Sequence, residues 1–138
     1  MKYLSSAYVY ITFYGDNLSL NEFSNILKLT PTNSGLKGDV GKYGAILRNT
    51  FWEYKMKETN ALKELESSIS EMREIFEGRI DLITNYILKK DIKAKCHIVI
   101  KSQNNEDTGA LLDGKFIAFL HKLKMQIEIN VYVDAVSS

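Results

Sequence analysis

The adjacent residues Cys96 and His97 are the pair in this chain that most resembles a catalytic nucleophile with its base. A thiol is activated when a base lies within hydrogen-bond reach of it. Both residues, however, fall in an alternating apolar and polar stretch, residues 93–101, which predicts a β-strand. Neighbouring side chains on a strand point to opposite faces, so the two cannot form a dyad. We expect Cys96 to lie in the core with Ile98 and Ile100, and His97 to lie on the solvent side.

Histidine is also the commonest metal ligand, and the chain has two histidines, His97 and His121. A metal site would need both to converge with Cys96 or with carboxylates, and their spacing matches no known ligand pattern. No serine lies in a nucleophile-elbow sequence. We therefore predict no catalytic, metal-binding or cofactor-binding residues, and we expect the protein not to be an enzyme.

The glycine-rich segment 35–44 could hold an anion, because backbone N–H groups in such loops can surround a phosphate. Lys37, Lys42 and Arg48 would add positive charge. A P-loop, however, has Gly-Lys followed by serine or threonine between a strand and a helix, whereas in this chain Tyr43 follows Lys42. The simpler interpretation is a connection that uses glycines for its turns. A small-ligand or anion site on Lys37, Lys42 and Arg48 stays open as the alternative.

The spacing of apolar residues predicts the elements that position these side chains. Ser19 and Asp113 are suited to cap the first and last helices. A connection over 30–43 is long for a segment without secondary structure of its own. The expected strands lie at about 7–14, 45–56, 93–101 and 127–134, and the expected helices at 20–27, 62–76, 80–90 and 116–123.

Three of these four strands have one apolar face and one mixed face. Such strands fit an open sheet that helices cover on one side only. We therefore predict a single α+β domain over residues 1–138. Its sheet would be four-stranded and mainly antiparallel, of the ferredoxin-like kind, with the element order β-α-β-α-(α)-β-α-β.

The mixed face of the predicted sheet combines aromatic and charged side chains, which is typical of a protein-binding surface. An RNA-binding sheet also displays aromatic residues, but its strand motif is absent from this chain. We predict either an unknown protein partner or self-association through this face. The candidate partner-binding residues are Tyr8, Tyr10, Tyr14, Phe51, His97 and Tyr132, among Lys55, Lys95, Lys101, Glu128, Asn130 and Asp134.

Composition excludes several other classes of protein. The chain has 138 residues, of which 45% are hydrophobic and 25% charged, as in folded globular domains. A net charge of +1 gives no electrostatic basis for binding nucleic acid or a membrane surface. No apolar run approaches the ~20 residues of a membrane span, and the first residues lack a signal-peptide core. One cysteine allows no internal disulfide, so we expect a cytoplasmic protein.

Short motifs along the chain resemble the domain-of-unknown-function family 4279, a group of small bacterial proteins. The similar segments are the tyrosine- and valine-bearing first strand and residues 21–27, 29–32, 35–39, 51–54 and 127–132. From this resemblance we would expect a small residue near position 124, before the last strand, where this chain has Lys124. The resemblance implies a stand-alone α+β domain with no established catalytic or cofactor residues. By analogy with other small bacterial domains, it implies a binding module of the immunity or antitoxin kind.

Overall fold

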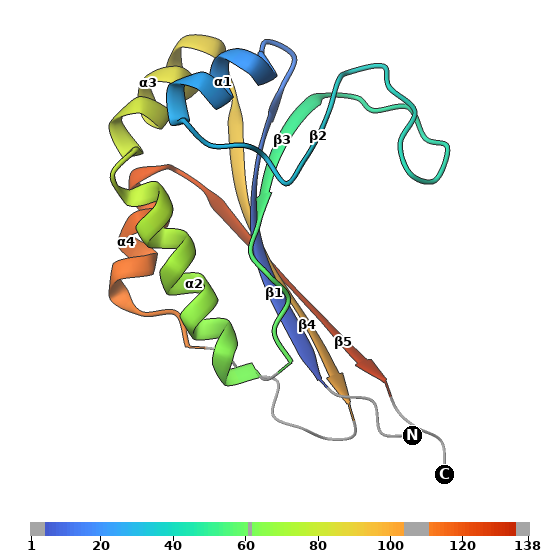
Figure 1. Ribbon diagram of the computed structural model, residues 1–138, viewed down its shortest axis with the longest axis vertical. Coiled ribbons are helices and arrows are strands. Elements are labelled where there is room, and N and C mark those ends of the chain that lie inside the picture. The colour runs from blue at the N-terminus through green and yellow to red at the C-terminus, as the bar shows by residue number, and fades with distance from the viewer. Residues whose placement is uncertain (1–4, 61, 104–110, 135–138) are drawn as a thin grey trace.

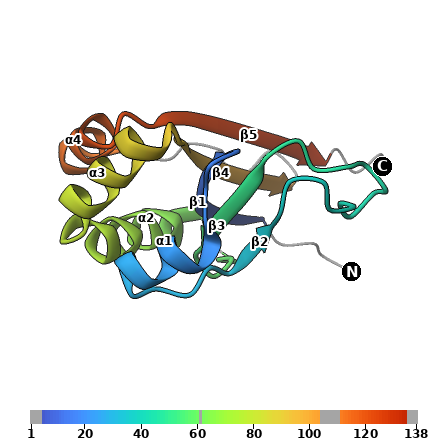
Figure 2. The ribbon, with the colours of Figure 1, turned by 90° about the horizontal axis from the view of Figure 1, so that it is seen from above.

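The fold is α+β, and the computed structural model describes residues 5–60, 62–103 and 111–134. The helices gather on one side of a single sheet, as both views show (Figures 1 and 2). In chain order the elements are β1 (Ser6–Gly15), α1 (Leu20–Leu27), β2 (Asn33–Gly35), β3 (Thr50–Lys55), α2 (Leu62–Glu77), α3 (Ile80–Lys90), β4 (Lys93–Gln103), α4 (Gly114–Lys122) and β5 (Gln126–Asp134).

The sheet is mixed and has five strands in the order β2-β3-β1-β4-β5. β1 pairs antiparallel with β3 and with β4, and β2 pairs antiparallel with β3. β4 and β5 are parallel neighbours, joined through α4, which returns the chain across the helix-covered face. The prediction of an α+β fold with helices on one face is therefore confirmed.

The prediction of four strands in a ferredoxin-like order is wrong in two respects. The connection over 30–43 contains the short strand β2, which the sequence did not reveal because Asn33–Gly35 has no apolar alternation. Thr32 anchors this segment: its N–H donates to the Glu53 carbonyl at 2.8 Å, and its hydroxyl accepts from the Lys55 N–H at 2.8 Å. In addition, β4 and β5 lie directly side by side, whereas a ferredoxin-like sheet places another strand between the two strands of such a unit.

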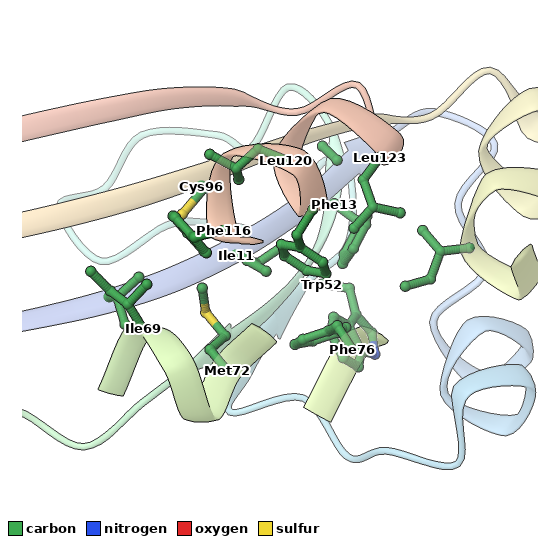
Figure 3. Close-up of a cluster of buried hydrophobic side chains, with 14 of the residues drawn as sticks. Ile11, Phe13, Trp52, Ile69, Met72, Phe76, Cys96, Phe116, Leu120 and Leu123 are labelled. Carbon is green, nitrogen blue, oxygen red and sulfur yellow. The ribbon is translucent and has the colours of Figure 1, made fainter. Parts of the chain in front are cut away.

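The core lies between the sheet and the helices. The side chains of β1 alternate as predicted, so that Ala7, Val9, Ile11 and Phe13 are fully buried on the helix side. α2 contributes its predicted apolar stripe, and α4 adds a second group of buried side chains (Figure 3). The buried apolar residues described in these two helices are Leu65, Ile69, Met72, Phe76, Phe116, Phe119 and Leu120.

An aromatic cluster around Trp52 forms one end of this core. The Trp52 ring meets those of Phe13, Phe23 and Phe76 at centroid distances of 5.9, 5.2 and 6.5 Å, all edge-on. Edge-on packing places the positive rim of one ring against the negative face of another. The Trp52 indole N–H donates to the Ser24 hydroxyl at 2.9 Å, which satisfies the one polar atom of the cluster's largest ring.

Side chains cap the starts of α1 and α4 as expected. Ser19 Oγ accepts from the Glu22 N–H at 3.4 Å, and Asp113 Oδ1 accepts from the Phe116 N–H at 2.9 Å. The backbone N–H of Ser19 donates to the Tyr86 hydroxyl at 3.1 Å, and not to the Glu22 side chain as in a capping box. This bond fixes the start of α1 to α3.

After three of the helices the chain turns through a residue in the left-handed conformation, and none of these three residues is glycine. The φ angles of Lys28, Asp91 and Lys124 are 54°, 53° and 52°. After α4, the Lys124 N–H donates to the His121 carbonyl and the Met125 N–H to the Leu120 carbonyl, both at 3.0 Å, as in a Schellman motif. Glycine would enter this conformation without the steric cost of a Cβ atom, whereas Lys124 bears that cost.

Within the described ranges, none of the helices has the length and apolar character needed to cross a membrane.

We expect Lys124→Gly to raise the free energy of unfolding by roughly 1 kcal/mol, because it removes the strain of a Cβ atom at positive φ. Chemical denaturation monitored by tryptophan fluorescence measures this change. Lys124→Ala is the control, since it removes the lysine side chain but keeps the Cβ atom. If the glycine variant is no more stable than the alanine variant, the turn is not strained.

We expect Ser24→Ala to lower the free energy of unfolding by about 1 kcal/mol, because it leaves the buried Trp52 N–H without its acceptor. The better helix propensity of alanine offsets part of the loss. The same substitution made in a Trp52→Phe background, where the donor is absent, should cost nothing when urea denaturation is followed by circular dichroism in all the variants. An equal cost in both backgrounds would assign the effect to α1 alone.

Candidate functional site

The open face of the sheet is the side opposite the helices, and no described helix covers it (Figure 2). Strand register brings its side chains into rows, because residues opposite one another on paired strands point the same way. The open face is formed by Tyr8, Tyr10, Thr12 and Tyr14 of β1, Phe51, Glu53 and Lys55 of β3, Lys95, His97, Val99 and Lys101 of β4, and Glu128, Asn130 and Tyr132 of β5.

A stacked cluster occupies the middle of the open face. Tyr10 lies opposite both Lys55 and His97. Its ring stacks on the His97 imidazole, with centroids 4.3 Å apart and planes at 9°. The centroid of the Tyr8 ring lies 6.0 Å from that of the Tyr10 ring. Two lysine ammonium groups lie over the Tyr8 ring, Lys55 Nζ at 3.9 Å and Lys101 Nζ at 5.5 Å from its centroid. We call Tyr8, Tyr10, Lys55, His97 and Lys101 the Tyr–His cluster.

Carboxylates balance the positive charge around this cluster. Glu128 Oε2 lies 3.1 Å from His97 Nδ1 and 3.4 Å from Lys95 Nζ. Glu58 Oε1, from the segment after β3, lies 3.5 Å from Lys101 Nζ. The open face thus presents both signs of charge beside flat aromatic surfaces.

Burial favours the neutral forms of the two central rings. It raises the pKa of Tyr10 to about 12, and the Glu53 and Glu128 carboxylates act in the same direction. Burial also lowers the pKa of His97 below 6.5, aided by Lys95 and opposed by Glu128. Desolvating a neutral phenol or imidazole costs less free energy than desolvating a charged group.

The structure separates the six predicted partner-binding residues into two groups. Tyr8, Tyr10 and His97 meet in the cluster, and Tyr132 lies on the same face, where it is paired with Lys101. Tyr14 and Phe51 lie opposite one another farther along β1 and β3, about 13 Å from Tyr10 by the strand rise.

Phe51 of the second group packs closely against β2. A Cβ atom at Gly35 would lie only 2.7 Å from the Phe51 ring, so this position of β2 admits no side chain without displacing Phe51. The ring is thus held by local packing and lies apart from the Tyr–His cluster.

Sequence reasoning placed Lys55 and Lys101 on this face but could not show that both ammonium groups meet the Tyr8 ring. That contact depends on the register of β1 with β3 and β4, which the alternation of each strand leaves open. Glu58 was missed altogether, since it follows β3 and no local pattern connects it with Lys101.

The glycine-rich segment 35–44 largely satisfies its own backbone. The N–H groups of Gly38, Gly41 and Gly44 donate to carbonyls of Leu47, Ala45 and Gly41 at 2.9, 2.6 and 3.0 Å. The Leu36 N–H donates to Asp39 Oδ2 at 2.9 Å. These bonds occupy donors that a bound anion would need.

The basic side chains of the anion-binding alternative are exposed. Lys37 Nζ pairs with Asp16 Oδ2 at 3.2 Å, Lys42 Nζ lies 5.8 Å from the Tyr43 ring centroid, and Arg48 is exposed near the start of β3. The segment projects away from the helices (Figure 1). Its geometry favours a structural turn over an anion site.

Cys96 and His97 point to opposite faces, as predicted. The Cys96 thiol is buried in the core, and burial raises its pKa to about 12 (Figure 3). His121 is exposed on α4. Within residues 5–60, 62–103 and 111–134, no group of three or more histidine, cysteine, aspartate or glutamate side chains is placed to hold a metal ion.

The chain matches the family described as Domain of unknown function (DUF4279) over residues 5–134, and it belongs to that family. The resemblance seen in its short motifs is therefore confirmed. No curated protein and no solved structure matched the chain.

We expect the pH dependence of stability to report the burial of His97. Because its pKa is lowered on folding, the unfolded chain binds more protons just below pH 6.5, so this residue makes stability rise with pH there. His97→Gln should therefore lose less stability than the wild type as the pH falls from about 7 to 5. Urea denaturation at each pH measures the difference between the two proteins.

His121→Gln is the matched control, since it replaces an exposed histidine with the same residue. Burial raises the pKa of Glu53 above 4.5, so this residue makes stability fall as the pH rises. Its contribution is the same in all three proteins. If the wild type gains stability over His97→Gln in acid, the ion pair with Glu128 outweighs burial and folding raises the pKa of His97 instead of lowering it.

Proposed function

We propose that this DUF4279 domain works by binding another protein through the open face of its sheet, and that it is not an enzyme. The observation that carries this proposal is the Tyr–His cluster, a set of stacked rings and cations on a face that no described helix covers. An immunity- or antitoxin-like role, in which the domain neutralises a partner by covering it, is one form of this function.

The cluster is suited to binding because its side chains are already held in place. Tyr10 is fixed by its stack with His97, and Tyr8 by the Lys55 ammonium. Ordering side chains on association costs about 0.5–1.5 kcal/mol for each long, flexible one, and prior ordering reduces that cost. Rigid tyrosines therefore make efficient contact residues.

The charges of the face favour a protein over a nucleic acid. Lys55 and Lys101 are accompanied by Glu53, Glu58 and Glu128, so the potential over the cluster is mixed. Nucleic-acid binding draws most of its affinity from contacts between basic side chains and phosphates, which neighbouring carboxylates oppose. A protein surface of mixed charge can pair its own acidic and basic side chains with both the lysines and the glutamates of this face.

We expect the double variant Tyr8→Ala/Tyr10→Ala to bind the protein partner at least 10-fold more weakly, because truncating aromatic contact residues removes the largest contributions to an interface. Immobilised domain exposed to a lysate of its source cells, with the eluate quantified by mass spectrometry, identifies the partner. Titration of the purified partner then gives the affinity of each variant.

Leu88→Ala, an exposed substitution on α3 in the helix layer, is the control and should bind as the wild type does. Circular dichroism must show that the double variant is folded. Equal affinity of the folded double variant and the wild type would refute binding through the open face.

A further inference from the structure

The strand β5 forms one edge of the sheet. It pairs with β4 on one side, and within the described residues no strand lies on its other side. An edge of this length presents a row of unpaired backbone N–H and C=O groups, which natural proteins usually protect with lysine, proline, a bulge or a cover. Residues 126–134 contain no lysine, arginine or proline.

The helix-side face of β5 is apolar and partly bare. Ile127, Ile129, Val131 and Val133 are exposed to 37, 51, 45 and 61%. On β4, the partners in register with Ile127, Ile129 and Val131 are buried apolar residues, namely Cys96, Ile98 and Ile100. The apolar layer of the core therefore continues past the edge of the helix layer, and we call these four residues the β5 stripe.

The length of α4 explains why the β5 stripe is bare. A helix of nine residues spans about 13 Å, whereas a strand of nine residues spans about 30 Å. α4 is joined to the start of β5 by the short turn at 123–125, and β5 runs on well past it (Figure 1). Only the first half of the strand can lie under its own helix, which agrees with the greatest exposure at Val133.

We propose that two copies of this chain pair antiparallel through β5, about a two-fold axis at Asn130, to form one continuous sheet of ten strands. In this register Ile127 faces Val133 of the other copy, and Ile129 faces Val131. β-Branched pairs of this kind stabilise antiparallel strands. Glu128 faces Tyr132, so no two like charges meet across the axis.

This arrangement also places a helix of the second copy over the exposed part of the β5 stripe. The axis is perpendicular to the sheet, so both helix layers lie on the same side. Because the two strands run in opposite directions, the α4 of each copy lies beside the last half of the other copy's β5, where the β5 stripe is most exposed. A single foreign strand would pair with the edge but bring no helix over Val131 and Val133, which is why a second copy fits better.

The two open faces become continuous in such a dimer. Tyr132 of each copy lies beside Glu128 of the other, which brings the two Tyr–His clusters onto one surface. The pairing itself uses the edge and the β5 stripe, and it is independent of whether the open face binds a partner.

Sedimentation velocity over a series of concentrations tests the proposal, with a dimer expected for the wild-type chain. Val133→Lys should raise the dissociation constant about 100-fold or more, because the two-fold axis places two lysines in the interface. Val133 is the most exposed residue of the β5 stripe, so the monomer should tolerate the change. Leu88→Lys, at a residue 74% exposed on α3, is the matched control and should remain dimeric.

Cysteine cross-linking tests the register without depending on a destabilised interface. Residues facing each other across an antiparallel pair have Cα atoms about 4.5–5.5 Å apart, within disulfide range. Asn130→Cys should therefore form a covalent dimer under mild oxidation, seen on a non-reducing gel. Leu88→Cys should not, and the buried Cys96 of the wild type should not either.

Three results would overturn the proposal. One is a wild-type chain that is monomeric at every accessible concentration, which would leave the edge to another occupant such as a strand of a different protein. Another is a dimer that persists in Val133→Lys while Asn130→Cys fails to cross-link. The third is a dimer that is lost in Tyr8→Ala/Tyr10→Ala and kept in Val133→Lys, which would move self-association to the open face.

Discussion

β1 is hydrogen-bonded on both sides, by β3 and by β4, so its alternation of side chains sets the two faces of the whole sheet. Ala7, Val9, Ile11 and Phe13 anchor the core, and the residues between them are directed to the open face. A shift of one residue in either register would exchange the two sets and bury the tyrosines. The position of Trp52 beside Phe13 and its bond to Ser24 depend on the same register.

The Tyr–His cluster is a consequence of this pairing. Tyr10 and His97 stack because they are directly opposite on neighbouring strands, and Lys55 reaches Tyr8 from the third strand. Partial burial in this row favours the neutral forms of the imidazole and the phenol, while Glu128 and Glu58 lie beside the ammonium groups of Lys95 and Lys101. The result is an ordered surface of low net charge, and it is the basis of the protein-binding role that we propose.

The helix layer is narrower than the sheet, and this mismatch concentrates exposed apolar surface at β5. α4 is too short to follow its strand, so the apolar side of β5 extends beyond the core that the other strands share. A two-fold pairing through β5 would close the edge and cover the stripe together. It would also join the two open faces, so that any partner would meet a surface with two clusters.

The sequence by itself determined the α+β class, the helix-side alternation of β1, the caps at Ser19 and Asp113, the burial of Cys96 and the family. The alternation of β1, the two caps and the burial of Cys96 each follow from spacing within one segment, where the period of a strand or helix decides the direction of a side chain. The class follows from the order of such segments, and the family from short motifs spread along the chain. Only the tertiary structure decided the strand order, the presence of β2, the contact of both lysines with Tyr8 and the bare apolar side of β5. These depend on pairing between distant segments and on the relative lengths of a helix and a strand, which no local pattern records.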